Sequence, residues 1–181
     1  MRIVAGKHKG LSLFEFDAEN IRPTSDRVRE NIFNKIQFRI MDSVVLDLFG
    51  GTGAVSLEFV SRGAKEVIIC DNNKNSINLI TKNFNKAKEK LNLINGDYKD
   101  CLKKLSDKKF DIIFLDPPYA SNFGEESINL IVSYKILKED GIIVFEHLLD
   151  TNYKIPNELE LLDCRKYGTI EVSFLGWKNN D

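Results

Sequence analysis

The sequence predicts an α/β domain built on a mostly parallel β-sheet, with an antiparallel hairpin at its C-terminal end. Two observations lead to this fold class. Short continuous apolar runs alternate with helical segments along most of the chain, which is typical of βαβ units with buried strands. Two longer apolar segments then flank Gly168, as the strands of a hairpin do.

Each element follows from a local pattern. In the N-terminal part, Ser25 or Asp26 caps a helix that turns Ile32, Phe33 and Ile36 toward the sheet. The apolar runs predicted as strands are Val44–Leu48, Glu66–Cys70, Leu91–Ile94, Phe110–Leu115 and Ile142–Glu146. The predicted helices are Ala54–Ser61, Asn73–Lys90, a short one at Leu102 and Leu105, and one from Ile128 to Leu137 before an Asp140-Gly141 turn. The predicted hairpin strands are Leu159–Tyr167 and Thr169–Trp177.

Composition bounds the class of protein. The 181 residues, 43% hydrophobic and 29% charged, suit one domain with its own core. A formal net charge of −1 restricts any nucleic-acid site to a local patch. No apolar run approaches the ~20 residues of a membrane span, and the three scattered cysteines match no metal spacing. We therefore expect a cytoplasmic protein without a metal centre and without a membrane anchor.

Polar sequences follow four of the predicted strands. They are Asp47-Leu48-Phe49-Gly50-Gly51-Thr52-Gly53, Asp71, Gly96-Asp97 and Asp116-Pro117-Pro118-Tyr119. In an open α/β sheet, ligands bind at the carboxyl ends of the strands. The four sequences therefore predict one ligand site at one edge of the sheet.

The glycines after the first strand let the backbone turn tightly and approach a ligand. A dinucleotide fingerprint would require a third glycine where this chain has Ser56. Asp47 would also repel a pyrophosphate, and it suits a ligand with a cationic amine. A plain strand-to-helix turn is the alternative for this loop, and a nucleotide-dependent oxidoreductase is disfavoured.

The acids of the next two strand ends suit an adenosine. Asp71 is placed to accept hydrogen bonds from ribose hydroxyls, and Asp97 is placed to accept from an exocyclic adenine amine. Each could instead be a loop or helix-cap aspartate. With the glycine loop and Asp47, they outline a pocket for an adenosine with a positive amino-acid tail, which is S-adenosylmethionine (SAM).

These motifs resemble a known family. DLFGGTG, CDNN, NGDYKD and DPPY, in this order and spacing, resemble the class I SAM-dependent methyltransferases, which implies their Rossmann-like fold and SAM contacts at Phe49, Asn72 and Tyr98. DPPY resembles the (D/N)PP(Y/F) signature of enzymes that methylate exocyclic amines of bases. The segments Arg2–Gly6, Lys9-Gly10 and Arg22–Asn34 are similar to the bacterial RsmD family, which methylates N2 of one guanine in small-subunit (16S) ribosomal RNA.

The resemblance covers the chain from Arg2 to the hairpin near Gly168. It implies a single methyltransferase domain over residues 1–181, with a basic extension in residues 1–40 and the SAM-binding catalytic core in residues 41–181. It also implies an assembled or assembling small ribosomal subunit as the substrate.

DPPY has a chemical reason at a strand end. Methylation builds positive charge on the amine nitrogen, which the Asp116 carboxylate and the Pro117 carbonyl can stabilise as acceptors. Tyr119 offers a ring for an extruded base, and such stacking contributes ~1–3 kcal/mol per base. A plain turn after a strand is the alternative for this motif.

Basic residues of the extension predict an RNA contact, because Arg and Lys hold phosphates. The predicted RNA-binding residues are Arg2, Lys7, His8, Lys9, Arg22, Thr24 and Arg27. A solvated basic face is the alternative. Two other functions stay open: an adenine-N6 or cytosine-N4 methyltransferase on DNA or RNA, and a non-catalytic RNA-binding Rossmann domain, against which the intact Asp116 argues.

Overall fold

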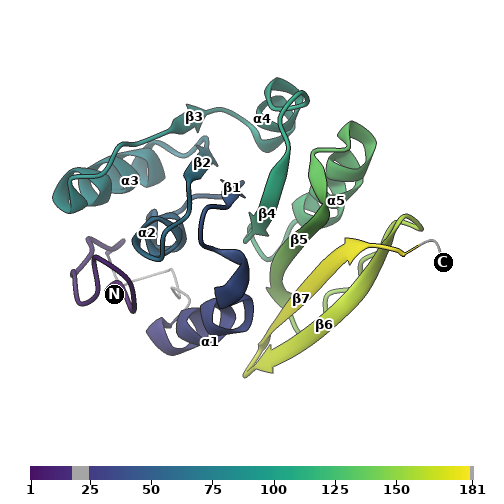
Figure 1. Cartoon of the computed structure of the whole chain (residues 1–181), viewed down its shortest axis with the longest axis horizontal. Helices are drawn as coiled ribbons and strands as arrows, with labels where there is room; N and C mark the ends of the chain where they lie inside the picture. Colours follow the sequence, from purple (N-terminus) through teal and green to yellow (C-terminus); the bar gives the residue numbers. More distant parts are fainter. Residues whose placement is uncertain (18–24, 180–181) are drawn as a thin grey trace.

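The computed structural model describes residues 1–17 and 25–179, in which seven strands form one sheet in the order β3-β2-β1-β4-β5-β7-β6 (Figure 1). The strands are β1 Val44–Asp47, β2 Glu66–Asp71, β3 Leu93–Asn95, β4 Phe110–Leu115, β5 Leu137–Leu148, β6 Leu159–Tyr167 and β7 Ile170–Trp177. The helices are α1 Asp26–Ile36, α2 Ala54–Ser61, α3 Lys74–Ala87, α4 Tyr98–Lys104 and α5 Phe123–Tyr134, with a 3₁₀ turn η1 at Gln37–Arg39.

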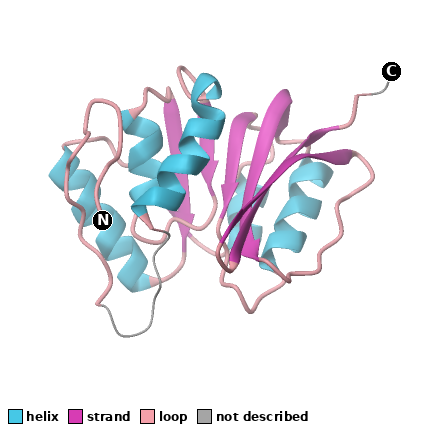
Figure 2. Ribbon diagram, turned by 90° about the horizontal axis from the view of Figure 1, so that it is seen from below, coloured by secondary structure: helices cyan, strands magenta, loops and turns pink. Residues whose placement is uncertain are grey.

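Helices cover both faces of the sheet (Figure 2). One apolar core joins the sheet to α1, α2 and α3, and the other joins it to α4 and α5. Strands β1 to β5 pair in parallel, and β7 pairs antiparallel with both β5 and β6. The predicted α/β class and its C-terminal hairpin are confirmed. The strand order reverses direction between β1 and β4, which is where ligands bind in such sheets.

The predicted end of the helix before β5 is wrong. Helix α5 ends at Tyr134, and Leu137 belongs to β5, where it pairs with Phe110. The register then shifts, so that Ile112 pairs with Ile142. The Asp140-Gly141 sequence forms an irregularity within the strand rather than a turn before it. Leu137 is buried, and burial of one apolar side chain fits a helix end and a strand start equally well.

Helix α1 begins as the sequence predicts. The Ser25 hydroxyl accepts a hydrogen bond from the Val28 amide at 3.2 Å, which satisfies one of the free donors at the helix start. Ile32, Phe33 and Ile36 are buried against the sheet.

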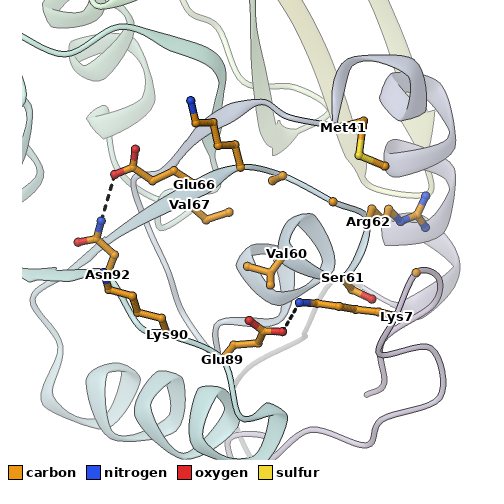
Figure 3. A pocket seen from close by; sticks show the side chains of 14 residues that line it. Lys7, Met41, Val60, Ser61, Arg62, Glu66, Val67, Glu89, Lys90 and Asn92 are labelled. Atoms are coloured by element: carbon orange, nitrogen blue, oxygen red, sulfur yellow. Dashed lines mark hydrogen bonds and ion pairs between the residues drawn. The ribbon is translucent and has the colours of Figure 1, made fainter.

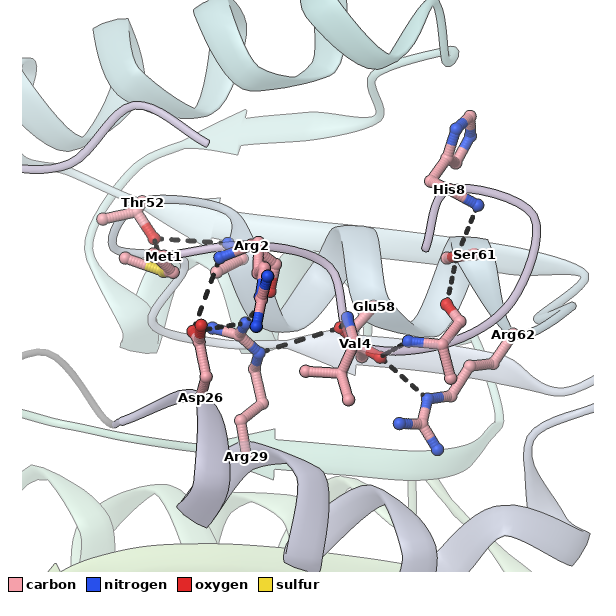
Figure 4. A network of polar contacts seen from close by, with 12 residues as sticks. Met1, Arg2, Val4, His8, Asp26, Arg29, Thr52, Glu58, Ser61 and Arg62 are labelled. Atoms are coloured by element: carbon pink, nitrogen blue, oxygen red, sulfur yellow. Dashed lines mark hydrogen bonds and ion pairs between the residues drawn. The ribbon is translucent and has the colours of Figure 1, made fainter. Parts of the chain in front are cut away.

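The N-terminal segment lies along α2 and is fixed by the buried carboxylate of Glu58 (Figure 4). The amides of Val4 and Ala5 each donate to it at 3.0 Å, and Arg62 Nε donates at 2.9 Å. At one end of the segment, the Met1 sulfur lies 3.8 Å from the hydroxyl of Thr52 in the glycine loop.

Candidate active site

A cavity of about 570 Å³ opens at the carboxyl edge of the parallel strands. All four polar strand ends contribute to its wall. The predicted site residues that line it are Phe49, Gly51, Asp71, Asn72, Asp97, Tyr98, Asp116, Pro117 and Tyr119. Leu48, Gly96 and Pro118, which lie within the four strand-end sequences but were given no role, also line it. Asn73, Ser76 and Phe123, which the sequence reasoning did not select, line it as well.

The glycine loop between β1 and α2 closes one side of the cavity. Gly50 packs against β2, because a Cβ there would stand 2.5 Å from Ile69 Cγ2. Gly51 and Gly53 have φ angles of 59° and 82°, in the left-handed region that favours glycine. No atom lies within 4 Å of the place where a Gly51 Cβ would stand, so the backbone of Gly51 borders open space.

Backbone amides fix the two acids that line this cavity from β2 and β3. Asp71 accepts from the Gly51 amide at 3.0 Å and from the Asn73 amide at 2.8 Å. Asp97 accepts from the Lys99 amide at 2.9 Å and caps α4. The cap that the sequence left as an alternative for Asp97 is therefore present, and the residue also borders the cavity.

Asp47 is buried at the end of β1, with 1% of its surface exposed. Unlike the other predicted SAM-binding and catalytic residues, Asp47, Gly50 and Gly53 do not line the cavity. The Ser56 hydroxyl donates to Asp47 Oδ2 at 2.6 Å. The other oxygen, Oδ1, has no hydrogen-bond partner among the described residues. Burial raises the pKa of Asp47 to about 7, because it outweighs the hydrogen bond from Ser56, which lowers the pKa.

Aromatic rings form another part of the wall. The ring centroids of Tyr98 and Phe123 lie 4.7 Å apart, and those of Phe49 and Tyr98 lie 5.6 Å apart. The Tyr98 hydroxyl bonds to Glu126. Burial, and then this hydrogen bond to a carboxylate, raises the pKa of Tyr98. The sequence offered one signal for Phe123, an aromatic residue just after the DPPY motif.

Asp116 directly follows β4, and Glu146 lies near the end of β5. The register pairs Leu115 with Phe145, so the two residues that follow this pair, Asp116 and Glu146, lie side by side. Burial, followed by repulsion from Glu146 and from the acid at the end of β1, raises the pKa of Asp116 well above its usual value. The Tyr119 hydroxyl donates to Glu146 Oε1 at 3.3 Å. The sequence reasoning missed Glu146, although it ends an apolar run as the other acids do.

The predicted RNA-binding residues fall in two places. Arg2 and Arg27 are exposed. The Arg2 amide donates to Asp26, the residue before Arg27, at 3.4 Å, and the preceding Met1 contacts the glycine loop (Figure 4). These contacts place this part of the extension toward the carboxyl edge. Arg22 and Thr24 lie outside the described residues.

Lys7, His8 and Lys9 lie at the opposite edge of the sheet, in a turn bound to the end of α2. The Lys7 amide donates to the Ser61 carbonyl at 2.9 Å. Lys7 Nζ and His8 Nε2 lie 2.5 and 2.6 Å from Glu89 Oε1. Burial alone would raise the pKa of Glu89, but the hydrogen bonds from Lys7 and His8 outweigh it and lower the pKa. Lys9 is exposed.

A groove of about 800 Å³ borders this turn (Figure 3). Its wall contains segments that precede β1, β2 and β3, including Met41, Lys65 and Lys90. It therefore lies at the amino edge of the parallel strands, away from the four polar strand ends.

The described ranges 1–17 and 25–179 contain no group of His, Cys, Asp and Glu that could hold a metal ion. Within the same ranges, every helix is too short or too polar to cross a membrane.

Comparison with known proteins agrees with this arrangement. The family model described as conserved hypothetical protein 95 matches residues 1–176. The chain is 34% identical over 174 residues to the ribosomal RNA small subunit methyltransferase D of Haemophilus influenzae, covering 94% of this chain and 90% of the relative. It is 33% identical to a putative rRNA methyltransferase of Bacillus subtilis, covering 96% and 97% of the two chains. A solved structure of a putative methyltransferase from Escherichia coli superposes with a TM-score of 0.87 at 27% identity, covering 98% of each chain.

Proposed function

The chain belongs to the family described as conserved hypothetical protein 95, the RsmD family that its motifs resemble, and on this premise we propose that it methylates the exocyclic N2 amine of one guanine in 16S ribosomal RNA. SAM supplies the electrophilic methyl group. The observation that carries the proposal is that Asp116 and Pro117 border the same cavity as Asp71 and Asp97. An acceptor for an amine and acceptors for an adenosine thus meet in one hollow.

The cavity fits SAM in its charge and in its donors and acceptors. Asp71, held by two backbone amides, suits the ribose hydroxyls. Asp97 suits the adenine amine, and Phe49, Asn72 and Tyr98 complete this end of the site. Asp47 does not line the cavity, but one of its buried oxygens lacks a partner among the described residues, which suits a cationic ammonium group better than a phosphate.

Asp116 and the Pro117 carbonyl are the proposed acceptors for the guanine amine. As the amine lone pair forms the new N–C bond, positive charge grows on the nitrogen, and fixed acceptors stabilise this charge. The raised pKa of Asp116 makes the ionised form of this side chain a stronger base for the proton that the amine must lose. Tyr119, 38% exposed at the rim, offers its ring to the extruded base.

RNA binding is proposed for the basic extension. Arg2 and Arg27 are on the side of the glycine loop, where they would hold phosphates near the target. Lys9 is exposed in the turn at the opposite edge, where it would hold a phosphate farther along the RNA. Lys7, His8, Arg22 and Thr24 belong to the same proposal. The proposed substrate is an assembled or assembling small subunit, which makes the protein cytoplasmic. We propose one methyltransferase domain over residues 1–181.

Transfer of tritiated methyl groups tests the function. The protein is incubated with labelled SAM and with small subunits, naked 16S RNA or DNA, and the modified base is then mapped. We expect one N2-methylguanine in 16S RNA. Label on an adenine or cytosine amine, label on DNA alone, or RNA binding without transfer would each replace this function with one of the alternatives.

A further inference from the structure

Glu146 is a second carboxylate beside the proposed amine acceptor. It has 1% of its surface exposed, and a buried carboxylate costs free energy that packing does not offset. Val144 and Phe114 face the core under α1, α2 and α3. Because side chains alternate along a strand, Glu146 and Asp116, each two positions further on, point to that same face. Glu146 and Asp116 therefore stand side by side, one strand apart.

Glu146 also borders the DPPY loop directly. A narrow space of about 10 Å³ lies between the two, lined by Pro117, Tyr119, Glu146 and His147 among others. The Tyr119 hydroxyl donates to Glu146 Oε1 across a long 3.3 Å. Tyr119 comes from a loop and is 38% exposed, so it can move aside for a base. The Glu146 oxygen that now accepts from a hydroxyl can then accept from a donor on the base.

His147 is less suited to read the base. Its Nδ1 lies 2.9 Å from the Leu148 carbonyl, which only accepts, so Nδ1 carries the proton and donates. Its Nε2 lies 2.8 Å from the Ser173 hydroxyl. Both ring nitrogens thus have partners outside the DPPY loop, whereas Glu146 bonds to Tyr119 of the loop itself.

The ring atom beside the exocyclic amine differs among the bases. In guanine two ring nitrogens flank the amine: N1, which carries a hydrogen, and N3, which presents a lone pair. In adenine and cytosine the corresponding ring nitrogen is unprotonated and presents a lone pair. A carboxylate beside the amine acceptor forms a charge-assisted hydrogen bond with N1–H of guanine, and it repels the lone pairs on the ring nitrogens of adenine and cytosine.

Resting on the proposed function, we propose that Glu146 selects guanine by accepting a hydrogen bond from N1–H while Asp116 and the Pro117 carbonyl accept from the N2 amine. Two carboxylates on neighbouring strands then match the two adjacent donors of guanine. A site built to bond a particular donor rejects an analogue that lacks it strongly. The DPPY motif alone does not provide this choice, because it recognises only the amine.

Replacement of the target guanine by 2-aminopurine tests the proposal, because 2-aminopurine keeps the amine but presents a lone pair at N1. Single-turnover rates are measured on small subunits carrying either base at the mapped position. The parent should methylate guanine at least ~10²-fold faster than 2-aminopurine. In Glu146→Gln the side-chain amide can donate to the bare N1, so the rate ratio should fall by at least ~10-fold.

Asp116→Asn is the matched control. It alters the acceptor of the amine, which both bases share, so it should slow both reactions by a similar factor and keep the ratio. Thermal unfolding and SAM binding of Glu146→Gln are compared with those of the parent to test whether the variant is folded.

Three outcomes separate this proposal from the proposed function. A parent that methylates guanine N2 but accepts 2-aminopurine equally well overturns the role of Glu146, even if Glu146→Gln does not fold. A folded Glu146→Gln that keeps the parental ratio also overturns it. A parent that does not methylate guanine N2 at all overturns the proposed function instead.

Discussion

The Ser56 hydroxyl lies 2.6 Å from Oδ2 of Asp47, so helix α2 holds the acid that ends β1. Ser56 occupies the position where a dinucleotide fingerprint has a glycine. The residue that departs from that fingerprint thus orients a buried carboxylate, whose other oxygen has no hydrogen-bond partner among the described residues.

Asp47→Asn should change how stability depends on pH. The folded protein raises the pKa of Asp47 to about 7, so between about pH 4 and 7 it binds a proton that the unfolded chain has released. As the pH rises through this range, the free energy of unfolding of the ligand-free parent should therefore fall by ~1.4 kcal/mol per pH unit relative to that of the variant. Urea unfolding at several pH values measures this, and parallel curves would contradict it.

Asp116 should control the rate but not SAM binding. Asp116→Ala removes an acceptor for the amine and should lower the single-turnover rate by ~10²–10³. Asp116→Asn should lie between the parent and Asp116→Ala, because its amide oxygen accepts a hydrogen bond without a full charge. SAM affinity, measured by calorimetry, should stay close to the parental value. Parental rates for Asp116→Ala would place the acceptor elsewhere.

Tyr119 should act through its ring. Tyr119→Phe keeps the stacking surface and loses the hydroxyl bond to Glu146, so it should retain most of the activity. Tyr119→Ala should lose most of it, since stacking is worth ~1–3 kcal/mol per base. Equal rates for both variants in the same single-turnover assay would argue against stacking.

Asp71→Ala should weaken SAM by about 1.5–3 kcal/mol, the usual size of a hydrogen bond to a charged group. Asp100→Ala is a matched control, because Asp100 is an exposed acid of α4 outside the cavity wall. Calorimetry should show loss for Asp71→Ala alone and no specific binding of NAD. Tight NAD binding without SAM binding would contradict the proposed methyltransferase function.

Lys7 and Lys9 should differ in their contribution to RNA binding. Lys9→Ala and Arg27→Ala should each flatten the slope of log K against log salt by about 0.7 per lost phosphate contact. Lys7→Ala should flatten it less, because Glu89 already neutralises this ammonium at 2.5 Å. Filter binding of 16S RNA at several salt concentrations measures the slopes. If the Lys7→Ala slope is the flattest of the three, the Glu89 pair does not hold in the complex.

The sequence by itself determined the α/β class, the hairpin, a helix cap at Ser25 or Asp26 and the four polar strand ends. These features are local, because apolar runs, turn residues and caps act over a few neighbouring residues. The rule that parallel strands place their carboxyl ends at one edge then predicted which of these ends would meet, and most of the residues chosen in this way line one cavity.

Only the tertiary structure decided what depends on register and on contacts between distant residues. The β4–β5 register sets Glu146 beside Asp116, and burial at the end of β1 raises the pKa of Asp47. The contact of Lys7 with Glu89 holds part of the basic extension at the edge of the sheet opposite the candidate active site. Such pairs are separated by tens of residues along the chain, so no local pattern records them, and the packing of the whole sheet and its helices selects them.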